Sequence, residues 1–190
     1  MVASNGMKLN LGCGTDIREG YVNLDSTKLP GVQVVHDIQK LPLPFKNEEF
    51  DEILCQDVLE HVDYPRVLKD LHRILKPGGK LSIRVPHFTS RNNYVDPTHV
   101  KRFSVRTFDY FIPDSHINKE KGRSYYFDFH FSRIASIRIT FDKHIFILRT
   151  INHYLIEPLV NISRKMQDFY ETTGFSRLFP GQNILVELIK

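Results

Sequence analysis

The sequence predicts an α/β fold built on a mostly parallel sheet, and two observations support this. The first is a set of five short apolar runs bounded by Gly, Pro or Asp, which cover residues 8–12, 21–25, 32–37, 52–56 and 81–86. Such runs are typical of buried strands. The second is a helix with one apolar face between the last two runs. A strand, a helix and a strand in this order form a βαβ unit, which implies parallel strands.

That helix has the clearest signals in the chain. Asp63 is expected to be its N-cap, and Pro65 lies in the first turn, where a missing N–H costs nothing. The segment Pro77-Gly78-Gly79 is expected to end it. Its apolar face is formed by residues at helical spacing, namely Val67, Leu68, Leu71, Ile74 and Leu75.

The first two connections are shorter than this pattern requires. About eight residues separate the first two strands and about six separate the second from the third, whereas a parallel crossover usually needs a dozen or more. Spacing alone therefore favours hairpins in this part of the chain.

The second half has weaker signals. Residues 103–111 are expected to form a short helix capped by Ser104, residues 125–141 one or two strands, and residues 183–189 a last buried strand. Residues 145–172 are expected to be helical with a break at Pro158. Their apolar residues are expected to pack in the core, and these are Ile151, Leu155, Leu159, Ile162, Met166 and Phe169. The alternative is that the segment forms a lid, a dimer face or a membrane-surface helix.

Length and composition predict one soluble domain over residues 1–190. Hydrophobic residues make up 41% and charged residues 25% of the 190 residues, which is ordinary for a globular protein. Only two cysteines occur, so a disulfide scaffold is excluded and a cytoplasmic location is expected. No apolar run reaches the roughly 18 residues of a membrane span. The formal net charge is +4, with the excess in the second half, which is expected to be a solvated basic face, although an anionic partner could bind there.

The sharpest motif is LNLGCGT at residues 9–15. A strand ending in Gly12-Cys13-Gly14 lets a ligand approach the backbone closely, although a simple tight turn has the same appearance. Asp25 ends the second strand and could accept hydrogen bonds from ribose hydroxyls. Asp37 ends the third strand and, with Ile38, could bind an adenine edge. Each acid could also be an ordinary turn residue, but their order along the chain favours a nucleoside site.

The sequence resembles the class I S-adenosylmethionine-dependent methyltransferases, and within them a small type 11-like branch. The resemblance rests on the glycine turn, on residues 37–86 and on the DPTHVKRF segment at residues 96–103. The resemblance covers residues 7–111 well and includes the last strand at 183–189. It is weak over residues 112–180, which are expected to form a variable substrate or lid region. It implies a Rossmann-like, seven-stranded, mostly parallel sheet with an antiparallel last strand. It also implies that the first two crossovers are shortened to loops, and we prefer this to hairpins.

The resemblance further implies S-adenosylmethionine as cofactor and S-adenosylhomocysteine as product. Residues 12–14 would line its methionine and ribose side, Asp25 would hold the ribose, and Asp37 with Ile38 would hold adenine. Gln56 and Asp57 would lie under the methionine part, with His61 facing the same cavity. Two positions depart from the family pattern, since Asn10 replaces the usual acid and Asp16 replaces a third glycine. The side-chain carbonyl of Asn10 can still accept a hydrogen bond from the cofactor.

The catalytic candidates follow the fifth strand. His87 is expected over the cofactor site. Asp96 could orient His99, which would act as a general base, or could simply start the Asp-Pro turn. Structural hydrogen bonding is the alternative for both histidines. His87, Asp96 and His99 could also form a metal site, but no tight ligand spacing supports it, and no metal site is predicted. Lys101 and Arg102 could bind an anionic acceptor or could equally form a solvated face.

The function predicted from these features is methyl transfer to an unidentified acceptor. The leading acceptor is a hydroxyl of a sugar or glycan precursor, possibly on a nucleotide- or lipid-linked carrier. Nucleic acid is a second acceptor class, and residues 145–172 could contact a membrane surface. The alternatives are a catalytically silent binding or scaffold module and a nicotinamide-dependent oxidoreductase, against which the missing third glycine argues.

Overall fold

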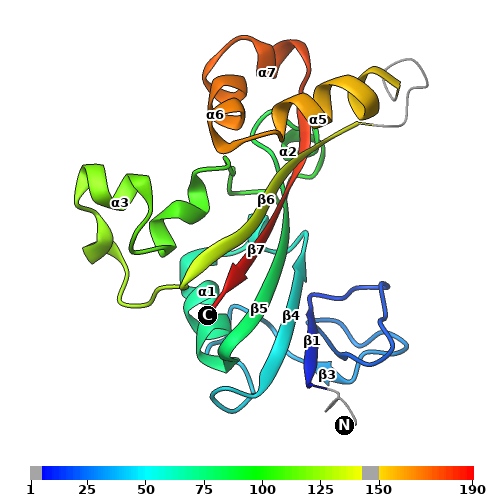
Figure 1. The fold of residues 1–190 in the computed structure, drawn as a ribbon. Helices are drawn as coiled ribbons and strands as arrows, with labels where there is room; N and C mark the ends of the chain where they lie inside the picture. The colour runs from blue at the N-terminus through cyan, green and yellow to red at the C-terminus, as the bar shows by residue number, and fades with distance from the viewer. Residues whose placement is uncertain (1–5, 143–149) are drawn as a thin grey trace, which may run out of the picture.

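The structure is a computed structural model that describes residues 6–142 and 150–190. Within these residues one seven-stranded sheet has the order β3-β2-β1-β4-β5-β7-β6 (Figure 1). The strands are β1 (Lys8–Leu11), β2 (Val22–Asp25), β3 (Val34–Val35), β4 (Phe50–Gln56), β5 (Leu75–Pro86), β6 (Arg133–Phe141) and β7 (Gly181–Ile189). Neighbouring strands from β1 to β5 pair in parallel, and β7 is antiparallel to β5 and β6. The predicted fold class is confirmed, including its antiparallel last strand.

The first two crossovers are loops, as the family resemblance implied and against the hairpins that spacing favoured. A buried side chain, Asn23 on β2, fastens the first loop. Its Oδ1 accepts hydrogen bonds from the Arg18 backbone N–H at 3.0 Å and from the Asn10 side-chain amide at 2.9 Å. Its own amide donates to the Arg18 carbonyl at 3.0 Å. These bonds satisfy loop backbone groups that a helix would otherwise pair internally.

Helix α1 (Tyr64–Ile74) confirms the predicted βαβ unit. Val67, Leu68, Leu71 and Ile74 are buried on its apolar face. Asp63 is the N-cap residue and Pro65 lies in the first turn, as predicted, but the Asp63 side chain makes no capping hydrogen bond. The large hydrophobic cluster joins this face to strands β1, β4, β5 and β7.

The remaining helices and turns are short, and most lie between β5 and β7. They are η1 (Leu59–His61), α2 (Asn92–Val95), η2 (Thr107–Phe111), α3 (His116–Lys121), η3 (Ser124–Tyr126), η4 (Asn152–Ile156), α5 (Glu157–Val160), α6 (Arg164–Thr172) and α7 (Phe175–Leu178). In Figure 1 α5, α6 and α7 form a lobe above one end of the sheet. A second apolar cluster lies beneath it, formed by Val105, Ile139, Phe141, Ile156, Val160 and Tyr170.

Three expectations for this half need correction. Residues 103–111 contain only a 3-10 turn from Thr107, and the Ser104 hydroxyl accepts from the Arg106 backbone N–H at 3.0 Å rather than capping a helix. Residues 125–141 contain one strand, which begins at residue 133. The helical break falls at residues 161–163, because Pro158 lies in the first turn of α5, where it needs no donor.

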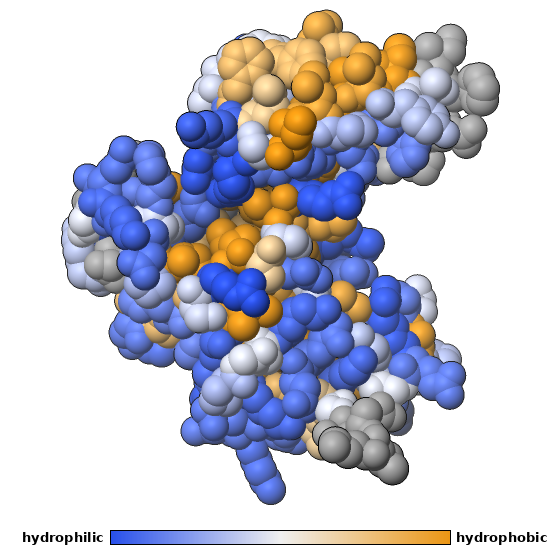
Figure 2. Space-filling model, in the orientation of Figure 1, coloured by the Kyte–Doolittle hydropathy of each residue, from blue (hydrophilic) through white to orange (hydrophobic). Residues whose placement is uncertain are grey.

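The apolar stripe of the 145–172 segment faces outward instead of packing in the core. Leu155, Leu159, Ile162 and Phe169 are 59, 42, 73 and 57% exposed, while Ile156, Val160 and Tyr170 are buried. Figure 2 shows this lobe as a largely apolar surface. Residues 145–149 of the segment lie outside the described residues. In the parts of the chain that the structure describes, no helix is long and apolar enough to cross a membrane.

Candidate functional site

The site lies at the carboxyl ends of the parallel strands. Strand β1 has β2 on one side and β4 on the other, so the direction of the strand order reverses at β1. Open α/β sheets bind ligands in the crevice at such a reversal. The predicted residues after β1, β2 and β4 therefore meet at one edge of the sheet.

The turn after β1 needs glycine at its first position. Gly12 has φ +64°, and a Cβ there would lie 2.5 Å from a methyl carbon of Val58. Gly14 has φ +49° and has no atom within 4 Å of its Cβ position. The backbone at Gly14 is therefore open to a ligand, whereas the turn at Gly12 packs against the residues that follow β4.

Asp25 is held rigidly beside this turn. Its Oδ2 accepts from the Gly14 N–H at 2.8 Å, and its Oδ1 accepts from the Thr27 N–H at 2.8 Å. Each oxygen keeps a lone pair for a further donor such as a ribose hydroxyl. Burial, followed by the charge of Asp25, raises the pKa of the Cys13 thiol, so the thiol stays protonated at this turn.

The other predicted cofactor residues lie around this crevice. Asp37 follows β3, and its Oδ1 accepts from the Gln39 N–H at 3.0 Å, while Ile38 packs partly against the core. Gln56 ends β4, and its Oε1 accepts from the Arg18 guanidinium at 3.4 Å. Arg18, which was not among the predicted site residues, also pairs with Asp16 at 2.9 Å.

Asn10 has a different environment from the one expected. It is 3% exposed, and its amide donates to the Asp16 carbonyl at 2.7 Å as well as to Asn23. Its nitrogen therefore fastens the loop between β1 and β2. A cofactor contact of Asn10 stays a prediction.

A polar cavity of about 620 Å³ lies beside the crevice, at the carboxyl ends of β4 and β5. We call it the Glu60 cavity. It is lined by Asp57, Glu60, His61, Arg84, Pro86, Asn92, Val95, Asp96, His99, Gln182 and Asn183. Four predicted site residues, Asp57, His61, Asp96 and His99, thus share one cavity, and Glu60 and Arg84 join them.

Asp57 is tied to the neighbouring strand. The Arg84 Nε lies 2.9 and 3.0 Å from the two carboxylate oxygens, and this pairing raises the pKa of Arg84. Asp57 also has φ +55°, a strained backbone conformation for a residue other than glycine. Its carboxylate is therefore committed to a fixed ion pair at the cavity wall.

Glu60 is the most unusual side chain in the cavity. It is 0% exposed, and neither carboxylate oxygen has a hydrogen-bond partner among the described residues. Burial raises the pKa of Glu60 to about 7, and the charge of Asp57 adds to the shift. A buried carboxylate without a partner is costly, so this position needs a separate explanation.

His99, Asp96 and His61 surround Glu60. The His99 Nε2 lies 3.6 Å from Asp96 Oδ2 and 4.0 Å from Glu60 Oε1, and the His61 and His99 rings meet edge to face at 4.6 Å. Burial, followed by the charge of His61, lowers the pKa of His99. Hydrogen bonds from Thr98 lower the pKa of Asp96. His99 is thus favoured as a neutral imidazole beside an ionised Asp96.

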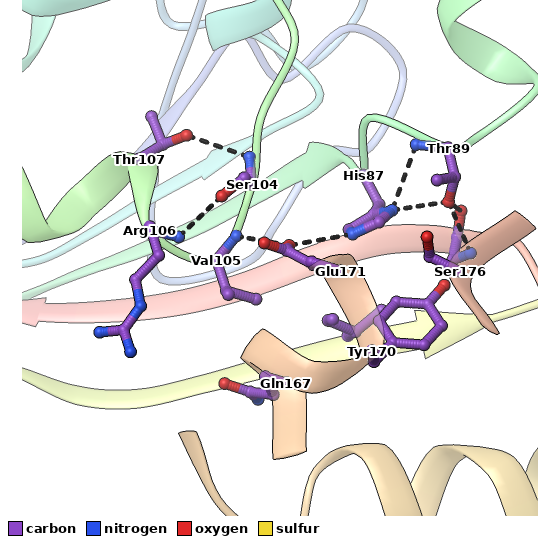
Figure 3. Close-up of polar contacts among 12 residues, drawn as sticks. His87, Thr89, Ser104, Val105, Arg106, Thr107, Gln167, Tyr170, Glu171 and Ser176 are labelled. Carbon is purple, nitrogen blue, oxygen red and sulfur yellow. Dashed lines mark hydrogen bonds and ion pairs between the residues drawn. The ribbon is translucent and has the colours of Figure 1, made fainter. Parts of the chain in front are cut away.

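His87 does not reach this cavity, which corrects the expectation that it lies over the cofactor site. It is 0% exposed, and its ring bonds inside the protein (Figure 3). Nδ1 accepts from the Thr89 N–H at 3.2 Å, and Nε2 lies 3.0 Å from Glu171 on α6. The Val105 N–H donates to the same Glu171 oxygen at 2.8 Å. His87 therefore connects the end of β5 to α6.

Comparisons with known proteins agree with this geometry. A family described as "methyltransferase domain" matches residues 5–83. A solved S-adenosylmethionine-dependent methyltransferase of Archaeoglobus fulgidus superposes with a TM-score of 0.55 over 97% of this chain and 86% of that chain, at 16% identity. The chain has the fold of the class I S-adenosylmethionine-dependent methyltransferases. The predicted fold is thereby confirmed, and the match of residues 5–83 to a methyltransferase domain agrees with the predicted family and with S-adenosylmethionine as its cofactor.

Other similar proteins extend the comparison. A phosphoethanolamine N-methyltransferase of Haemonchus contortus, solved with S-adenosylhomocysteine, gives a TM-score of 0.51 at 18% identity, covering 97% of this chain and 49% of that chain. An uncharacterised protein of Methanocaldococcus jannaschii is 36% identical over 38% of this chain and 40% of its own length. A demethylmenaquinone methyltransferase of Staphylococcus epidermidis is 37% identical over 35% of this chain and 29% of its own length. The alignments thus span less than half of these curated relatives.

The sequence carried a signal for one of the residues that were not predicted, Glu60. Glu60 lies among Val58, Leu59 and Val62, which are buried, so a carboxylate in this run is unexpected. No Lys or Arg occurs three or four positions away in the sequence, where a helical ion pair would form. An acid in an apolar run without a basic neighbour predicts either a protonated group or a ligand.

Proposed function

We propose that this chain transfers the methyl group of S-adenosylmethionine to a hydroxyl acceptor that enters the Glu60 cavity. The observation that supports this most is the pairing of the open backbone at Gly14 with the fixed carboxylate of Asp25, at the reversal of the strand order. Asp25 binds the ribose hydroxyls, Asp37 and Ile38 bind adenine, and Gln56 lies under the methionine part.

The chain itself has to supply little beyond position. The bound cofactor provides an activated methyl group on a sulfonium. The walls of the Glu60 cavity orient the acceptor oxygen and exclude water, which accounts for most of the rate in such transfers. Asp96 or His99 accepts the proton of the acceptor hydroxyl. They are the two predicted catalytic residues that line the cavity. His87 holds α6 in place and takes no part in proton transfer.

The acceptor proposed is a sugar or glycan-precursor hydroxyl on a lipid carrier. Amide and carboxylate side chains line the Glu60 cavity, as a polyhydroxylated ligand requires. Asn92 and Gln182 also line a second cavity of about 580 Å³, whose wall includes Tyr94, Leu178 and Phe179. A polar head in one cavity and an apolar chain in the other would suit an amphiphilic acceptor. Acceptor screens therefore begin with lipid-linked saccharides.

Calorimetric titration of S-adenosylhomocysteine tests the cofactor site. We expect micromolar affinity for the unchanged protein and at least a tenfold loss in Asp25→Ala, about 1.4 kcal/mol. Asp114→Ala is the matched control, because Asp114 is an exposed carboxylate that pairs with Lys119 at 3.4 Å, and it should leave the affinity unchanged.

Absence of binding by the unchanged, folded protein would contradict the proposal. The chain would then be a scaffold module with this fold. Equal affinity of the Asp25→Ala variant and the parent would move the cofactor away from this carboxylate.

A further inference from the structure

We propose that Glu60, His61 and His99 form a binding site for one divalent transition-metal cation, open to the Glu60 cavity. One ligand atom from each of these residues lies within 4.8 Å of the other two. Among the described residues, no other group of three His, Cys, Asp or Glu side chains lies this close together. Two imidazoles and one carboxylate are a donor set that suits cations such as Zn²⁺, Co²⁺ or Fe²⁺.

The spacing fits a shared cation after small side-chain rotations. Ligands bound at about 2.0–2.2 Å to one ion lie at most about 4.3 Å apart. The His99 Nε2 and Glu60 Oε1 atoms are already 4.0 Å apart, with no hydrogen bond between them. Hydrogen-bonded partners would stand at about 3 Å, so this gap is too wide for a direct bond and suits a bridging ion.

Among the described residues, the hydrogen bond of the His61 ring engages Nδ1, so Nε2 is the nitrogen that could bind a metal. The Thr98 hydroxyl donates to Asp96 Oδ1 at 2.6 Å and lies 2.9 Å from His61 Nδ1. A hydroxyl has one hydrogen, so toward His61 it can only accept. The proton of His61 is therefore on Nδ1, and Nε2 presents a lone pair. Metal-binding histidines are commonly held by such a chain of hydrogen bonds to a carboxylate.

The burial of Glu60 supports the same conclusion independently. Both of its carboxylate oxygens are enclosed and lack partners in the described part of the chain, although a simple structural acid would have been matched with donors. A divalent cation bound between these oxygens and the two imidazoles would compensate the buried charge. Asp57 cannot compete for it, because Arg84 already neutralises that carboxylate.

The position of the site suggests its use, and this step rests on the proposed function. A cation at Glu60, His61 and His99 would face the acceptor in the cavity. It would lower the pKa of a coordinated hydroxyl and hold its oxygen toward the methyl group. His99 would then act as a ligand of the cation rather than as the proton acceptor.

Titration with Co²⁺ tests the site directly. The full chain is stripped with a chelator, and Co²⁺ is added while visible absorption and binding heat are measured. We expect one Co²⁺ per chain, visible ligand-field bands and displacement by Zn²⁺. Glu60→Gln, which keeps the side-chain shape, should weaken binding at least tenfold. His116→Ala should not, although it removes an exposed histidine that pairs with Glu120 at 3.1 Å.

Three results would overturn the site. They are no Co²⁺ uptake by the stripped parent, unchanged affinity in Glu60→Gln, or an equal loss in His116→Ala, which would indicate surface binding. Titrating S-adenosylhomocysteine into the same samples separates this proposal from the proposed function. Retained cofactor binding without Co²⁺ binding rejects the metal site alone, and it also shows that the parent is folded.

Discussion

Two buried histidine–glutamate pairs lie at the carboxyl edge of this sheet, and their surroundings differ. His87 and Glu171 approach to 3.0 Å, and Glu171 also accepts from the backbone of Val105 (Figure 3). His99 and Glu60 are 4.0 Å apart, and both oxygens of Glu60 lack partners among the described residues. The first pair is saturated by the protein, whereas the second has unused donors and acceptors.

The difference separates a structural role from a binding role. Buried polar groups are nearly always hydrogen-bonded, since an unpaired one costs free energy. A saturated pair can only hold the fold together, as His87 does between β5 and α6. An unsaturated pair at a cavity wall retains the capacity to bind a ligand. Residue type and burial alone do not distinguish the two pairs, but their hydrogen bonds do.

The largest expected effect is loss of stability on breaking the saturated pair. Glu171→Ala leaves the His87 Nε2–H and the Val105 N–H without an acceptor. Each buried unpaired donor costs about 1–3 kcal/mol, so the free energy of unfolding should fall by about 2–6 kcal/mol. Urea denaturation measures it, with Glu60→Gln as the control that should change stability by less than about 1 kcal/mol in chelator at pH 5. A greater loss in Glu60→Gln would reverse the two roles.

The second effect is a pH dependence of stability in the metal-free chain. Burial raises the pKa of Glu60 from 4.5 to about 7, so between these pH values the folded chain keeps a proton that the unfolded chain releases. The free energy of unfolding should therefore fall as pH rises from 4.5 to 7. The loss is about 2–3 kcal/mol, at about 1.4 kcal/mol per pKa unit.

Urea denaturation between pH 4.5 and 7.5 in chelator measures this slope. Glu60→Gln cannot titrate, so its profile should lack the contribution. Parallel profiles for the parent and the variant would mean that Glu60 ionises normally despite its burial. Adding Zn²⁺ to the parent should raise its stability most near pH 7, where metal ligands are deprotonated.

The order of the motifs predicted the fold better than the lengths of the connecting loops did. Short links after β1 and β2 favoured hairpins, yet both pairings are parallel. What replaces the crossover helix is the buried side chain of Asn23, which fastens the first loop by hydrogen bonds. Such a compensation depends on contacts across several residues, so periodicity and loop length do not reveal it. The order of the glycine turn and the strand-end acids was the more informative signal.

The site was predicted in part for a similar reason. Asp57, His61, Asp96 and His99 do share a cavity, because parallel strands bring their carboxyl ends together. His87 follows β5 as directly as expected, but its direction is set by Glu171 on α6, a residue far along the chain. Tertiary partners of this kind decide between a catalytic and a structural histidine.

The smallest expected effect on stability is that of a substitution beside the unsaturated pair, at Thr98. Thr98→Val removes the hydroxyl that accepts from His61 Nδ1 and donates to Asp96, while nearly preserving side-chain shape. The His61 ring would lose the bond that fixes its tautomer, so Co²⁺ affinity should fall about tenfold, within the 10–100-fold range for residues that orient metal ligands. Thr98 is exposed, so stability without metal should change by less than about 0.5 kcal/mol. Unchanged Co²⁺ affinity would remove Thr98 from the site, whereas Thr98→Ser, which keeps the hydroxyl, should restore binding to the parent level.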